Sequence, residues 1–90
     1  MKVEDIEALG WTNQNIFVRN SDVVIFRHPF ETSKKEGIKS HVFSYSPSTN
    51  NVLINEFYYK DSSPVMIEVF RDKIDSINEL KEIMKKHNIV

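Results

Sequence analysis

The amino-acid sequence predicts an α+β fold, in which a five-stranded antiparallel meander carries an N-terminal and a C-terminal helix on one face (α-β-β-β-β-β-α). Apolar residues recur at helical spacing near both ends of the chain, and runs rich in β-branched and aromatic residues fill the middle. The links between those runs are short, which favours antiparallel neighbours over parallel crossovers. We therefore expect residues 1–90 to form a single domain.

The first helix is expected over residues 2–9, where three apolar residues recur at every third position among acidic ones. Gly10 suits the position that follows a helix, and Trp11 would then fold back on Ile6. A tryptophan beside a helix end in a small domain is more often a lid on the core than a ligand platform.

The five predicted strands are apolar runs that end at turn-forming residues. They lie at residues 16–19, 23–28, 38–45, 52–59 and 65–70. The last of these runs is apolar on both faces except at Glu68, which favours an interior position in the sheet. The loop at residues 29–37 is the longest polar segment, and it lacks the glycine and lysine spacing of a phosphate-binding loop.

The second helix, at residues 77–87, is the best-specified element of the chain. Ser76 and Glu79 form an S-x-x-E capping box, which satisfies two backbone N–H groups at the start of a helix. Asn88 suits the left-handed position after the helix, and it would fold Ile89 back onto the last turn.

The composition argues against several classes of function. Twelve basic and thirteen acidic residues give a net charge of −1, so nucleic acid is not an expected partner. The absence of cysteine excludes a disulfide framework and cysteine-based zinc sites. The longest aliphatic or aromatic run, Val23–Phe26, is too short to cross a bilayer, and the N-terminus is acidic where a signal peptide would be apolar. We expect a cytoplasmic protein without a membrane partner.

No motif predicts a catalytic residue, a metal ligand or a cofactor. His28 and His41 lack the H-x-H or H-E-x-x-H spacing of metal sites, and no serine lies in a G-x-S-x-G elbow. His87 follows two lysines at a helix C-terminus, where a solvated capping residue is expected. A weak hydrolase that uses His28 or His41 stays open as an alternative, and it requires a pocket where histidines and carboxylates converge.

A second alternative is a binding protein for a nucleotide or another small anionic ligand. Aromatic side chains beside cations on a sheet face can stack bases. The candidate residues for this face are Phe43, Tyr45, Phe57 and Tyr59 with Lys39, His41 and Arg27. Lys34 and Lys35 are further candidates for contacting the anion. A core position under the helices is the competing interpretation of the aromatic rings.

The function that we expect first is recognition of another protein, or of a second copy of this chain, without catalysis. An uncovered sheet face or an edge strand is a common docking surface. The candidate interaction residues are Tyr45, Tyr58 and Phe30 as aromatic anchors, with His41 and Lys39 beside them.

The segments IEALGW, YSPSTNNVLI and PVMIEVFRDKIDSINELKEIMKKHNI follow one another in an order that spans most of the chain. This layout resembles small uncharacterised helix–β-meander–helix proteins encoded by phages and mobile elements of low-GC bacteria. The resemblance implies an accessory protein that acts by binding host proteins, including defence components, or nucleotide signals. It assigns no functional residue.

Overall fold

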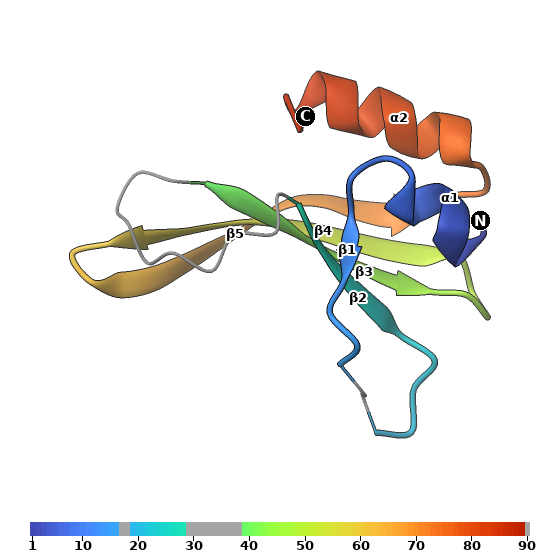
Figure 1. The fold of residues 1–90 in the computed structure, drawn as a ribbon, viewed down its shortest axis with the longest axis horizontal. Helices are drawn as coiled ribbons and strands as arrows, with labels where there is room; N and C mark the ends of the chain where they lie inside the picture. Colours follow the sequence, from blue (N-terminus) through green and yellow to red (C-terminus); the bar gives the residue numbers. More distant parts are fainter. Residues whose placement is uncertain (17–18, 29–38, 90) are drawn as a thin grey trace.

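The structure is a computed structural model that describes residues 1–16, 19–28 and 39–89. Its elements in chain order are α1 (Val3–Glu7), β1 (Thr12–Asn13), β2 (Val24–His28), β3 (Ser40–Ser46), β4 (Asn51–Lys60), β5 (Ser63–Lys73) and α2 (Ile77–Lys86). The strands form one antiparallel sheet in the order of the sequence, which confirms the predicted α+β meander (Figure 1). Within the described residues, neither helix is long and apolar enough to cross a lipid bilayer.

Both helices lie on the same side of the sheet, as predicted (Figure 1). Phe26, Phe43 and Ile54 oppose one another across β2, β3 and β4, so their side chains share one face, and each is 0% exposed. Ile6 of α1 and Leu80 of α2 belong to the same buried cluster. The core therefore lies between the helices and this face of the sheet.

The opposite face of the sheet, called the open face below, alternates with the core positions along each strand. Its apolar side chains are Ile25, Val42, Leu53, Phe57, Tyr59 and Met66. Neither helix packs over this face, and these side chains are half-buried by their neighbours or, in the case of Met66, exposed.

The prediction of a first strand at residues 16–19 is wrong. The first strand is β1, whose two residues come directly after Trp11, while Ile16 and Arg19 lie outside any strand and residues 17 and 18 lie outside the described part of the chain. The cause is the burial of Trp11, which is 2% exposed and packs against the rings of His28 and Phe43. This contact brings the next residues alongside β2, where the polar segment pairs despite its low strand propensity.

The interior position predicted for the last strand is also wrong. β5 is an edge strand that pairs with β4, and it is longer than the predicted run. Met66 is 55% exposed and Ile67 is 46% exposed, so the apolar side chains of this run are not all buried, as they would be in an interior strand. At a bulge in the ladder, Val69 has no directly opposed residue on β4, and both Val69 and Phe70 pack against the edge of the core.

The ends of α2 follow the sequence prediction closely, whereas α1 is shorter than the predicted helix at residues 2–9. Ser76 Oγ accepts the N–H of Glu79 at 3.3 Å, whereas the Glu79 carboxylate accepts from the N–H of Asp75 at 3.1 Å instead of from Ser76. Asn88 adopts a φ of 55°, and the N–H of Ile89 donates to the carbonyl of Met84 at 2.8 Å. This is the left-handed ending predicted for α2. After α1, the backbone turns through residue 10, a glycine with a φ of 98°.

Candidate functional site

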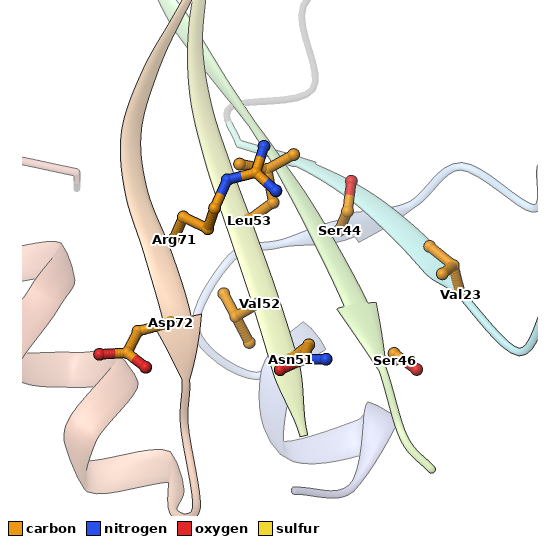
Figure 2. A pocket seen from close by; sticks show the side chains of 8 residues that line it. All are labelled: Val23, Ser44, Ser46, Asn51, Val52, Leu53, Arg71 and Asp72. Atoms are coloured by element: carbon orange, nitrogen blue, oxygen red, sulfur yellow. The ribbon is translucent and has the colours of Figure 1, made fainter. Parts of the chain in front are cut away.

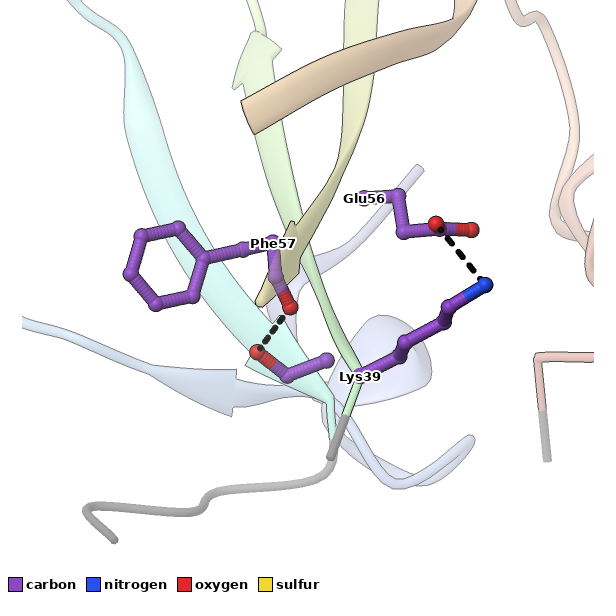
Figure 3. A network of polar contacts seen from close by, with 4 residues as sticks. Lys39, Glu56 and Phe57 are labelled. Atoms are coloured by element: carbon purple, nitrogen blue, oxygen red, sulfur yellow. Dashed lines mark hydrogen bonds and ion pairs between the residues drawn. The ribbon is translucent and has the colours of Figure 1, made fainter. Parts of the chain in front are cut away.

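The open face carries a preorganised aromatic and basic cluster. The rings of Phe57 and Tyr59 meet edge to face with centroids 5.4 Å apart. The guanidinium carbon of Arg27 lies 4.9 Å from the Phe57 ring centroid, and its Nη2 donates to Ser40 Oγ at 3.2 Å. Ser40 Oγ donates in turn to the carbonyl of Phe57 at 3.5 Å (Figure 3). Arg27 is thus held in place before any partner binds.

A hollow of about 400 Å³ lies at the other end of the open face (Figure 2). Val23, Ser44 and Leu53 line it together with Arg71, whose guanidinium lies beside Leu53. The Arg71 side chain donates from Nε to the Glu68 carboxylate at 2.7 Å. Because the hollow has an apolar floor with hydroxyl groups and an arginine at its side, it can bind a partner side chain that has both apolar and polar atoms.

The edge of β5 adjoins the open face. Met66 lies opposite Phe57 and points to the open face, while Ile67 lies opposite Glu56 and points to the helix side. Both side chains are about half exposed, at 55% and 46% respectively. Among the strands of the described sheet, β4 is the partner of β5 on one side, so its other side offers backbone groups for pairing.

A second site lies on the helix side and gathers all three histidines of the chain. His28, His41 and Glu56 oppose one another across β2, β3 and β4, and His87 reaches them from the C-terminal cap of α2. With Lys39, these side chains line a cavity of about 430 Å³, called the histidine pocket below. Residues 88 and 89 complete its wall.

Electrostatics in the histidine pocket favour a neutral imidazole at His41. Burial lowers the pKa of His41 from its ordinary 6.5, and the nearby His28, His87 and Lys39 lower it further, whereas the Glu56 carboxylate acts in the opposite direction. Lys39 Nζ lies 3.4 Å from Glu56 Oε1, which occupies the carboxylate in part (Figure 3). His28 is 6% exposed, and its buried Nδ1 has no hydrogen-bond partner among the described residues.

The histidine pocket satisfies one requirement of the predicted hydrolase alternative, since histidines and a carboxylate do converge. The chemistry that this arrangement can perform is proton transfer by a neutral imidazole. The residues that line the pocket include no serine or threonine. In the described part of the chain, no group of three histidine, aspartate or glutamate side chains is placed to hold a metal ion.

The structure separates the predicted interaction residues. Tyr45 is not a surface anchor, because its ring is 2% exposed in the core and its hydroxyl donates to Asn50 Oδ1 at 3.2 Å. Tyr58 is half-buried on the helix side, with Lys39 Nζ 5.7 Å from its ring centroid. His41 and Lys39 belong to the histidine pocket. Phe30, with Lys34, Lys35 and the rest of the predicted loop, lies outside the described residues.

The predicted aromatic face is also divided between the two sides of the sheet. Phe43 and Tyr45 lie in the core, whereas Phe57 and Tyr59 lie on the open face with Arg27. The open-face residues Leu53, Met66 and Arg71 were not predicted from the sequence. Their signal lies in the register of two hairpins, β3–β4 for Leu53 and β4–β5 with its bulge for Met66 and Arg71.

No protein-family model matches this chain, and searches of curated proteins and of solved structures gave no match either.

Proposed function

We propose that this protein is a non-catalytic interaction module that binds another protein through the open face and the adjoining edge of β5. The observation that carries the proposal is the apolar surface of the open face, which neither helix covers. Apolar side chains gathered on one face of a small protein are a common mark of a binding surface.

The composition of this surface supports the proposal further. Arginine, tyrosine and phenylalanine contribute strongly to protein interfaces, and Arg27, Phe57 and Tyr59 form one cluster on the open face. Because Arg27 is already fixed by its ring contact and its hydrogen bonds, a partner would lose little side-chain entropy at this position. The exposed edge of β5 adds backbone donors and acceptors for an extended segment.

The resemblance of the layout to accessory proteins of phages and mobile elements supports a host protein as the partner, for example a component of a defence system. Self-association through the same surface is part of this proposal, because the open face and the edge of β5 are equally accessible to a second copy.

The proposal is tested with two variants and a matched control. Phe57→Ser acts on the open face and Met66→Asp acts where the face meets the edge, while Lys81→Glu alters an exposed position on α2. Light scattering reports self-association, and affinity capture with mass-spectrometric identification supplies a partner whose binding is then measured directly. Both surface variants should weaken binding at least about tenfold while they keep a cooperative unfolding transition, and the control should bind like the wild type. Unchanged binding and oligomeric state in both variants would refute the proposal.

The histidine pocket supports a second candidate, a weak hydrolase in which His41 acts as a general base. Hydrolysis of an activated ester tests this candidate: the activity of the wild type should be lost in His41→Gln and retained in Lys81→Glu. Equal rates in the wild type and His41→Gln exclude this role for His41.

Binding of a small anion is the third candidate, with the hollow beside Arg71 in place of the divided aromatic face. A nucleotide screen by thermal shift tests it, because a ligand that binds the native state raises the melting temperature. A rise that persists in Arg71→Gln would exclude the hollow as the site.

A further inference from the structure

The C-terminal turn, defined here as His87, Asn88 and Ile89, forms one wall of the histidine pocket. It is held to α2 by backbone hydrogen bonds, from His87 to Ile83 at 3.0 Å and from Ile89 to Met84 at 2.8 Å. It is held to the sheet by the side chain of Ile89, which is 5% exposed in the core. A short segment at an element end, held by few contacts, opens at a lower free energy than the whole domain.

The ionisable groups that face His41 come from every element around it. His28 lies on β2, Glu56 on β4 and His87 at the end of α2, while Lys39 directly precedes β3. Besides the histidines, the described residues that line the pocket include one cation, Lys39, and one carboxylate, Glu56, and these two groups form an ion pair at 3.4 Å. A proton on His41 adds a second positive charge beside the one carboxylate among the described lining residues.

Two opposing effects act on the turn as the histidines gain protons. The carbonyl groups at the C-terminus of α2 favour a positive charge at His87, which is the C-cap residue of the helix, and this effect favours the closed turn. A proton on His41 must be accommodated at a side chain that is 9% exposed, beside the buried His28 and opposite His87. Opening of the turn relieves both the burial of that charge and its repulsion from His87, so a proton on His41 favours the open turn.

We propose that the histidine pocket is a pH-sensitive latch, in which protonation of His41 in mildly acidic solution releases the C-terminal turn from the sheet. This inference is independent of the interaction proposed for the open face, because the two sites lie on opposite sides of the sheet.

The direction of the effect follows from proton linkage. Because the closed pocket lowers the pKa of His41, the open form binds a proton more readily than the closed form. The closed form is therefore fully favoured above pH 6.5, and it loses its advantage as the pH falls from 6.5 towards the lowered value. For one proton, the equilibrium between open and closed forms changes by up to about tenfold per pH unit in that window.

Amide hydrogen exchange, corrected for the intrinsic exchange rate, measures this opening in the intact protein. The amide of Ile89 reports the turn, and the amide of Ile54 in the centre of the sheet reports global unfolding. Between about pH 7.5 and about pH 5.5, the opening constant of Ile89 should rise by up to about tenfold, and it should exceed that of Ile54 at every pH because the turn opens at a lower free energy than the whole domain. In His41→Gln, the acid-induced rise at Ile89 should disappear.

Two further variants keep the test decisive. His87→Gln changes a half-buried side chain at the helix end, and it should reduce the acid response even if His41→Gln does not fold. Glu56→Gln removes the one carboxylate that opposes the shift, so the response should extend to lower pH. Equal opening constants at Ile89 and Ile54 would show that the turn opens only by global unfolding, and an opening constant at Ile89 that does not change with pH would show that the pocket does not respond. Either result overturns the latch.

Discussion

Replacement of Gly10 by alanine is the substitution whose cost can be worked out most directly from the structure. Gly10 has a φ of 98°, a backbone conformation that residues with a Cβ atom adopt only with strain. A Cβ atom at this position would lie 2.6 Å from Nε2 and 2.9 Å from Cδ2 of His28. Both distances are too short for a non-bonded contact, so either the ring or the backbone has to move.

The expected cost is the sum of a backbone contribution and a packing contribution. The positive φ costs an alanine about 1–2 kcal/mol. Displacement of His28 adds about 1–3 kcal/mol, because its ring is 6% exposed and packs edge-on against Trp11 with centroids 5.3 Å apart. The total of about 2–5 kcal/mol is a large part of the roughly 5–14 kcal/mol expected for a domain of this length.

Urea unfolding, followed by the fluorescence of Trp11, measures this loss. At an m-value of about 1.5 kcal/mol/M, a loss of about 3 kcal/mol lowers the midpoint by about 2 M. A double-mutant cycle with His28→Ala separates the two contributions. In that background the methyl group has room, so Gly10→Ala should cost only the backbone contribution of about 1–2 kcal/mol.

Two results would refute this reasoning. A cost for Gly10→Ala below about 0.5 kcal/mol would mean that the positive φ is not required at this position. An equal cost in the wild-type and His28→Ala backgrounds would mean that the histidine ring does not limit the space beside Gly10.

Three other predictions concern the stability of the domain. Ser76→Ala removes the hydroxyl that caps α2, and urea titration should show a loss of about 1 kcal/mol; unchanged stability would mean that the cap contributes nothing. Two serine hydrogen bonds lower the pKa of the exposed Asp22 carboxyl, so its stabilising effect is present above pH 3.8 and is lost as the pH falls below that value. Asp22→Asn should therefore flatten this part of the pH–stability curve, and a curve like that of the wild type would contradict the assignment. Trp11→Phe removes the indole N–H that donates to Met84 Sδ at 3.3 Å, and it leaves a smaller ring in the core. Calorimetry should therefore show a lower melting temperature, and an unchanged melting temperature would contradict this prediction.

Local signals in the sequence were sufficient for the helix ends and for most of the strands. The serine cap of α2 and the left-handed asparagine after it depend on residues within one turn of each other, and the structure has both features. The strand that begins the sheet was misplaced because its position depends on a long-range contact. Residues 12 and 13 pair with β2 because Trp11 is buried against His28 and Phe43, and no pattern within residues 12–15 indicates that contact.

The candidate site was harder to predict, because the residues that share a face depend on strand register. The predicted turn at residues 46–51 implies that Tyr45 lies opposite Val52, and the structure has this pair. It follows that Tyr45 points into the core with Val52, whereas Phe57 and Tyr59 point to the open face. The same dependence explains β5: an apolar run predicts a strand, but only the order of the strands decides whether it lies inside the sheet or at its edge.

By itself, the sequence determined the α+β class, the two helices and the ends of α2, because short-range periodicity and turn chemistry control these features. The tertiary structure alone decided that β5 lies at the edge, that the open face holds Arg27 against Phe57, and that three histidines share one pocket. These features join residues distant in sequence, so they depend on how strands pair and where helices pack, which local patterns do not specify.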